Sequence, residues 1–203
     1  MVNHVTSDAE IVSLDVTGSA QLTNETVKQF LQTHASITKL VISGCWRLNE
    51  SIFEFTRQPS LKSSSYLCHL DLSDLPHLDD LMLRTIAQSS STRRLKTLNV
   101  ARCKMITDSG IKALTRLRHL QSLNLNYCVS VRGISFQTLL SKCETLKSLR
   151  ADGLHMIEDR AIRSIAAREA SFGYGAGTGG VVSLEQLSLC NCRRRALFRR
   201  FVG

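Results

Sequence analysis

Apolar residues recur along this chain in a fixed sequence motif that occurs seven times. Each copy has apolar residues at positions one, four and six, and several copies have cysteine at position nine. The position-four residue is always leucine, and successive copies lie 26, 30, 28, 25, 26 and 38 residues apart. These leucines are Leu14, Leu40, Leu70, Leu98, Leu123, Leu149 and Leu187. A period of about 20 to 50 residues indicates a repeat architecture.

Each repeat combines a strand pattern with a helix pattern. Positions one, four and six point inward, and the residues between them face outward along a short strand. After the strand, apolar residues change to three- and four-residue spacing, as in Ile106, Ile111 and Leu114, which predicts an amphipathic helix. Thr107 and Thr23 precede two of these stretches and are suited to cap the helices. We therefore predict an α/β solenoid with parallel strands on the concave face and helices on the convex face.

The cysteines fit this repeat without disulfides or metal. Cys45, Cys103, Cys128 and Cys192 occupy position nine, where the chain turns inward, so we expect a ladder of buried free thiols. The total of seven cysteines is odd, and one thiol per repeat leaves successive thiols pointing the same way. Cys190 and Cys192 form a C-x-C pair, but alternation places them on opposite faces, so we predict no metal site and no cofactor.

The run from Leu98 through Cys103, Ile106 and Thr107 to Ile111 closely resembles the cysteine-containing leucine-rich repeat. This repeat is typical of F-box proteins with leucine-rich repeats and of antagonist-of-mitotic-exit-network-type proteins. The resemblance implies a protein-protein interaction module that recognises substrates for an SCF-type ubiquitin ligase, with Skp1 and cullin as further partners. It also implies a protein that is not itself an enzyme.

The first repeat already begins near Ile11, so we expect the ligase-docking F-box to be absent or the chain to be a fragment. Small mitochondrial relatives share the repeat and lack an F-box. A non-enzymatic scaffold or assembly factor, for example for a mitochondrial complex, is therefore the alternative function. Under either function we expect a monomer or one subunit of a hetero-complex.

The composition limits the cellular compartments in which we expect the protein. The chain contains no run of eighteen apolar residues, so we expect no membrane span. Residues 1–10 contain neither an apolar signal core nor an Arg-rich presequence. We therefore predict a cytoplasmic or nuclear protein, with the mitochondrion as the alternative.

The net charge of +9 is concentrated at the C-terminal end of the sequence. Five arginines lie in the last eleven residues, and without them the net charge is +4, from 21 basic and 17 acidic residues. They are Arg193, Arg194, Arg195, Arg199 and Arg200. Because the repeats carry no dense basic stripe, nucleic acid is not the expected partner.

The domain organisation follows from the period. We predict an N-terminal extension over 1–10, one solenoid over 11–192 and an Arg-rich tail over 193–203. A Gly-rich loop over 171–180 and an insertion over 58–65 lengthen two of the repeats. The loop contains G-x-G-x-x-G, but a helix precedes it and a strand follows it, which is the reverse of the order in a dinucleotide site.

The outward-facing strand positions form the predicted partner-binding surface on the concave face. We expect it to include His69, Asp71, Asn99, Arg102, Asn124, Asn126, Tyr127, Arg150 and Asp152. Tyr and Arg are enriched where binding energy concentrates, so Arg102, Tyr127 and Arg150 are the strongest candidates. His69, Asp71 and Ser73 resemble a nucleophilic triad in type only, because alternate residues on a strand lie about 6.6 Å apart. We predict no catalytic residues.

Overall fold

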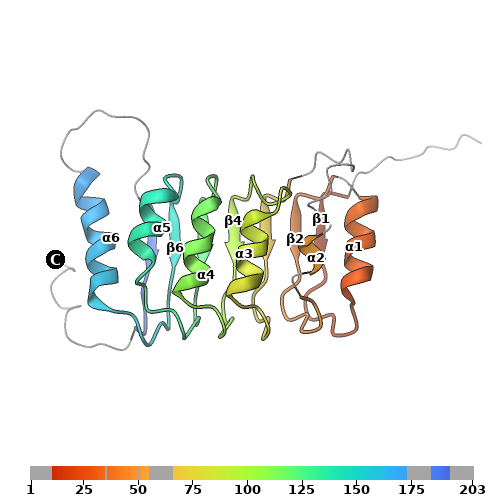
Figure 1. Cartoon of the computed structure of the whole chain (residues 1–203), viewed down its shortest axis with the longest axis horizontal. Coiled ribbons are helices and arrows are strands. Elements are labelled where there is room, and N and C mark those ends of the chain that lie inside the picture. Colours follow the sequence, from red (N-terminus) through yellow and green to blue (C-terminus); the bar gives the residue numbers. More distant parts are fainter. Residues whose placement is uncertain (1–10, 35, 50, 55–65, 173–183, 193–203) are drawn as a thin grey trace, which may run out of the picture.

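The computed structural model describes residues 11–34, 36–49, 51–54, 66–172 and 184–192. Seven strands of three residues lie side by side in chain order in one parallel sheet, and the helices cover one face of it (Figure 1). The strands are β1 (Ser13–Asp15), β2 (Lys39–Val41), β3 (His69–Asp71), β4 (Thr97–Asn99), β5 (Ser122–Asn124), β6 (Ser148–Arg150) and β7 (Gln186–Ser188). The predicted α/β solenoid is confirmed.

The helices alternate with the strands along the chain. They are α1 (Asn24–Thr33), α2 (Ser51–Glu54), α3 (Asp80–Gln88), α4 (Asp108–Ala113), the 3-10 turn η2 (Leu114–Arg116), α5 (Phe136–Lys142) and α6 (Asp159–Phe172). Helix α6 continues through Phe172, so the first two residues of the predicted Gly-rich loop are helical. The rest of that loop, residues 1–10, the insertion over 58–65 and the tail over 193–203 lie outside the described residues.

The seven position-four leucines pair with one another across the sheet, as the repeat spacing predicts. Leu14 pairs with Leu40, and the same register continues through Leu149 and Leu187. From Leu40 to Leu149 these side chains are at most 1% exposed, whereas Leu187 is 45% exposed. Burying a leucine contributes about 1.5 to 3 kcal/mol, so this row forms the centre of the core.

Backbone pairing continues beyond the strands into the turn that follows. At position eight the N–H of each of the first six repeats donates to the position-seven carbonyl of the next repeat, with N–O distances of 2.7 to 3.0 Å. This position has a left-handed backbone in all seven repeats, with φ between 56° and 71°. The residues are Gly18, Gly44, Asp74, Arg102, Tyr127, Gly153 and Asn191.

The position-nine thiols form the predicted ladder, although only Cys45, Cys103 and Cys128 are buried and Cys192 is half-buried, and these thiols also donate hydrogen bonds. The Sγ atoms of Cys103 and Cys128 lie 3.2 and 3.1 Å from the position-six carbonyl oxygens of the preceding repeats. Cys45 and Cys192 make the same contact. Burial raises the pKa of both the Cys103 and the Cys128 thiols to about 12, so the S–H stays available as a donor. All seven cysteines are free thiols.

The helix starts connect neighbouring repeats. Thr107 Oγ1 accepts from the Ser109 N–H at 3.1 Å, and Thr23 caps α1 in the same way, as the sequence predicts. Asp80, the first residue of α3, accepts from the Thr107 N–H at 2.8 Å and from its hydroxyl at 2.6 Å. A Cβ on Gly110 would lie 2.4 Å from Asp80 Oδ1 and 3.2 Å from Asp80 Cα. Helices α3 and α4 therefore approach closely only because residue 110 is glycine.

We predict that Gly110→Ala lowers the free energy of unfolding by about 1 to 2 kcal/mol, although alanine has the higher helix propensity. The added methyl group must displace Asp80, which two hydrogen bonds from Thr107 hold in place. Urea unfolding followed by circular dichroism measures this change. Ser109→Ala is the control, because Ser109 is exposed on the same helix and its loss should change stability by less than about 0.5 kcal/mol. Equal stability of the two variants would contradict the argument.

We predict that Cys190 reacts with a thiol reagent in the native protein at pH 8, whereas Cys103 and Cys128 react only after unfolding. Cys190 is exposed, and the two others are buried with a pKa of about 12. At pH 8 the reactive thiolate is then roughly one part in ten thousand of each buried thiol. Mass spectrometry of labelled peptides measures the three rates. Labelling of Cys103 at the rate of Cys190 would show that the ladder opens freely.

Candidate protein-interaction surface

The outward side chains of the strands form rows that cross the sheet from repeat to repeat. We call this side of the sheet the strand face; it is the predicted concave face. In the position-three row, His69 Nδ1 lies 3.1 Å from Thr97 Oγ1, and Ser148 donates to Gln186 at 3.2 Å. His69 is exposed at its predicted place on this face. The row therefore presents hydroxyl, imidazole and amide groups to solvent.

The position-five row closes the turns that follow the strands. Asp71 Oδ1 accepts from the Ser73 N–H at 2.9 Å. Asn99 and Asn124 accept from the N–H two residues later at 3.1 and 3.0 Å. Asn99 also donates to Asp71 across the strands at 2.8 Å. These three predicted partner-binding residues lie on the strand face as expected, but each also holds its own repeat together.

Asn126 and Asp152 perform the same task across repeat boundaries. Asn126 is only 9% exposed, and its side-chain oxygen accepts from the Asp152 N–H at 2.9 Å. Asp152 in turn accepts from the Cys190 N–H at 2.7 Å and from the Ser188 hydroxyl. Burial alone would raise the pKa of Asp152, but these two hydrogen bonds and nearby Arg150 outweigh it, and the pKa is lowered. Asp152 is therefore held as a carboxylate that organises β7.

Exposed side chains gather in the turns that follow β3, β4 and β5. We call Asp74, Arg102 and Tyr127 the position-eight row. Arg102 lies 3.6 Å from the Asp74 carboxylate, and its guanidinium carbon lies 6.0 Å from the centre of the Tyr127 ring. Tyr127 packs over Gly153, where any Cβ would lie 2.4 Å from the ring. An anion, a cation and an aromatic ring thus stand next to one another on three consecutive repeats.

The position-eight row differs from the polar rows beside it in exposure. The Arg102 and Asp74 side chains are 63% and 48% exposed, and Tyr127 is 43% exposed. All three residues have a left-handed backbone, and their N–H groups bond to the next repeat while their side chains stay exposed. Arg150 on β6 is exposed as well. The three strongest candidates of the sequence, Arg102, Tyr127 and Arg150, are therefore all accessible.

The groups that suggested a nucleophilic triad are paired differently. The Ser73 hydroxyl donates to Asp71 at 2.6 Å, whereas His69 lies against Thr97. In the ranges that the structure describes, no three His, Cys, Asp or Glu side chains gather where they could hold a metal ion. Nor does any helix in those ranges have the length and apolarity needed to cross a membrane.

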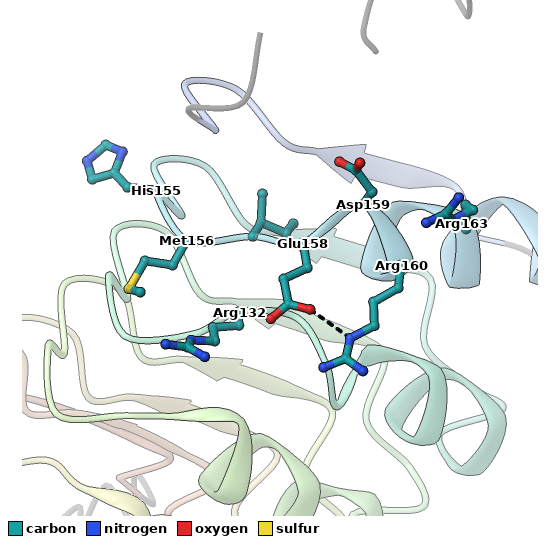
Figure 2. Close-up of a pocket in the computed structure, with 8 residues that line it drawn as sticks. Arg132, His155, Met156, Glu158, Asp159, Arg160 and Arg163 are labelled. Carbon is teal, nitrogen blue, oxygen red and sulfur yellow. Dashed lines mark ion pairs between the residues drawn. The ribbon is translucent and has the colours of Figure 1, made fainter. Parts of the chain in front are cut away.

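Two features of this surface are not evident from the sequence. Asp74 completes the position-eight row, and its pairing with Arg102 depends on the left-handed turn in both repeats. A pocket of about 680 Å³ also opens beside the start of α6 (Figure 2). Arginines and carboxylates share it, and Arg160 pairs with Glu158 at 2.8 Å. Each feature joins residues from neighbouring repeats, and the repeat pattern does not specify such pairs. The arginines of the predicted basic tail lie outside the described residues.

A solved structure of another protein shares this architecture. A chain of the yeast Rad7–Elc1 complex matches 70% of this chain with a TM-score of 0.54 and 20% identity. The match covers 36% of the yeast chain, so the present chain spans about a third of its length. Leiomodin-1 actin-binding site 2 matches 79% of this chain and 79% of its own length, with a TM-score of 0.48 and 19% identity. At this level of identity the yeast structure shows a shared fold.

A family model supports the same conclusion from the sequence side. The model of leucine-rich repeats described as plant disease resistance protein RPS2-like matches residues 3–129, which is more than half of the chain. Membership of the cysteine-containing subclass of F-box proteins stays a prediction. Leucine-rich repeats and a solenoid with an exposed polar surface make the chain a protein-interaction module. The chain belongs to the RPS2-like leucine-rich-repeat family.

Proposed function

We propose that this chain recognises a protein partner through the position-eight row and Arg150, and that it does so as the substrate-recognition part of an SCF-type ubiquitin ligase. The recognition half of this proposal rests on the difference between polar side chains that form hydrogen bonds within the solenoid and side chains that stay exposed. Asp71, Asn99 and Asn126 hold the repeats together, whereas Arg102 and Tyr127 remain exposed. A partner gains more binding energy from side chains that do not already hold the repeats together.

The chemistry of the row favours a polar protein surface as its partner. Tyr127 offers an aromatic face and a hydroxyl group at small entropic cost, and packing on Gly153 already limits its motion. Arg102 can exchange its exposed contact with Asp74 for a partner carboxylate, because an exposed pair at 3.6 Å is worth only about 0 to 1 kcal/mol. The partner surface is therefore expected to contribute a carboxylate beside an apolar group.

The ubiquitin half of the proposal is supported by the resemblance of the repeats to those of F-box proteins. A chain of similar fold is also found in a complex of two proteins, Rad7 and Elc1. In this proposal the chain is not an enzyme, and Skp1 and cullin join it through a surface separate from the position-eight row. The proposal places the chain in the cytosol or nucleus, where free thiols such as those of the ladder stay reduced.

We predict that the double variant Arg102→Gly/Tyr127→Gly loses the partner but keeps the fold. Glycine adopts the left-handed backbone of both positions more easily than Arg or Tyr, so the free energy of unfolding should change by no more than about 1 kcal/mol. Losing 1.4 kcal/mol or more of binding would reduce partner recovery about tenfold or further. Quantitative mass spectrometry of proteins copurified with the tagged chain measures the recovery, and urea unfolding measures stability.

The matched control for this experiment is Leu81→Ala/Arg84→Ala on α3. It also removes one large side chain and one cation, and both residues are exposed on the helix side of the solenoid. We expect partner recovery within about twofold of the wild type, since exposed residues outside an interface contribute little to binding. Equal losses in both double variants would show that the position-eight row is not the recognition surface.

The ubiquitin half of the proposal has a separate test. We predict that Skp1 and a cullin copurify with the wild-type chain from its own cells at moderate salt. They should also copurify with the position-eight variant, because ligase docking and substrate recognition use different surfaces. A stable complex without Skp1 or cullin would overturn this half and identify the chain as a scaffold or assembly factor.

A further inference from the structure

A second pocket, of about 500 Å³, lies at the edge of the solenoid where α3, η2 and α5 end and lead back into strands. Its charged lining comes from three consecutive repeats. We call it the basic pocket, and its charged and hydroxyl side chains of interest are Arg93, Thr115, Arg116, Arg118, Thr138 and Lys142. It lies at the opposite end of the strands from the position-eight row, so it is independent of the proposed function.

Among the described residues that line the basic pocket, four are cations and none is a carboxylate. The ion pairs found among the described residues are Arg102–Asp74, Lys147–Glu185 and Arg160–Glu158, and none of them includes a cation of this pocket. These cations are therefore not engaged in ion pairs within the described part of the chain and are available to an anion.

The helix ends account for only part of this charge. Arg116 and Lys142 are the last residues of η2 and α5, where a cation interacts favourably with the helix dipole. Arg93 and Arg118 lie in the loops beyond α3 and η2, and the dipole effect falls off within the last turn. The loops thus add two further guanidinium groups to an edge whose helix ends already carry cations.

Existing hydrogen bonds position the two loop arginines and use few of their donors. One Nη of Arg118 donates to the Lys142 carbonyl at 3.2 Å, and one Nη of Arg93 donates to the Tyr66 hydroxyl at 3.0 Å. The Arg93 guanidinium carbon also lies 5.4 Å from the centre of the Tyr66 ring. A guanidinium carries five N–H donors, so both groups keep donors for a ligand while their direction is restrained.

The pocket beside α6 in Figure 2 provides a comparison within the same chain. It contains arginines too, but Glu158 and Asp159 line it, and Arg160 points toward Glu158 at 2.8 Å. These two carboxylates therefore offset part of the positive charge of its three arginines, Arg132, Arg160 and Arg163. The basic pocket has a comparable set of cations without such carboxylates, which distinguishes a site for an external anion from an ordinary mixed-charge surface.

We propose that the basic pocket binds a phosphate-bearing anion, either a small polyphosphate or a phosphorylated side chain of another protein. A phosphate group is a compact anion with several acceptor oxygens that can bond to cations from three directions, and arginine contacts it with two parallel N–H bonds. A carboxylate has only two oxygens and one charge. The volume of about 500 Å³ lies within the range of about 300 to 1,000 Å³ that is common for small-ligand sites.

The test is isothermal titration calorimetry of the full chain with sodium tripolyphosphate at 50 mM salt. We expect saturable binding that Arg93→Gln/Arg116→Gln weakens at least tenfold. Arg132→Gln/Arg163→Gln removes the same charge from the pocket beside α6 and should weaken binding less than twofold. Because the cations are exposed, affinity should also fall when salt rises to 200 mM. No binding by the wild type, or equal losses in both double variants, would overturn the proposal.

Two further titrations distinguish the sources of phosphate. A phosphoserine peptide that binds, competes with tripolyphosphate and loses affinity without its phosphate would support a phosphorylated protein as the source. Binding of tripolyphosphate alone would support a free polyphosphate. Binding of a DNA duplex that requires Arg93 and Arg116, without any binding of tripolyphosphate, would overturn the proposal in favour of a nucleic-acid surface. Urea unfolding of both double variants confirms that they are folded.

Discussion

The left-handed turn at position eight is the constraint on which the rest of this solenoid depends. It lets the chain leave the strand while its N–H still bonds to the next repeat, at 2.7 to 3.0 Å. In four of the seven repeats a residue other than glycine adopts this turn, despite the steric cost of that conformation. The same turn that bonds one repeat to the next therefore also fixes where Arg102 and Tyr127 project.

Most of the fold could be predicted from the sequence, because one sequence motif specifies every repeat. The register of the leucines, the thiol ladder and the caps at Thr23 and Thr107 all follow from local spacing. Which polar residues hold the repeats together, and which stay exposed for a partner, could not be predicted. Asn99 and Asn126 have the residue type of binding groups, but the same short amide side chains close turns, and only the neighbouring repeat decides which use prevails. The basic pocket is lined by side chains from three repeats, and the motif of a single repeat does not specify such a combination.

The two proposed surfaces differ in how the fold supports them. The position-eight row is held by backbone geometry, so its side chains can change without loss of the hydrogen bonds that join the repeats. The basic pocket is held by side chains, with Arg118 bonded to a carbonyl and Arg93 to a tyrosine. Substitutions in the row should therefore alter recognition with little effect on stability, whereas the pocket tolerates fewer changes in its own shape. A partner protein and an anion could occupy the chain together, since they use opposite edges.

The pairing of each three-residue strand only with its neighbours has a mechanical consequence. A force that pulls the first and last repeats apart loads the repeat interfaces in series, because each described strand pairs only with the strands of adjacent repeats, and the weakest interface opens first. The interfaces would then open in sequence at low force, as a zipper does, and would not resist together as strands do under shear. A solenoid of this kind yields gradually under tension and can re-form one repeat at a time when the tension is released.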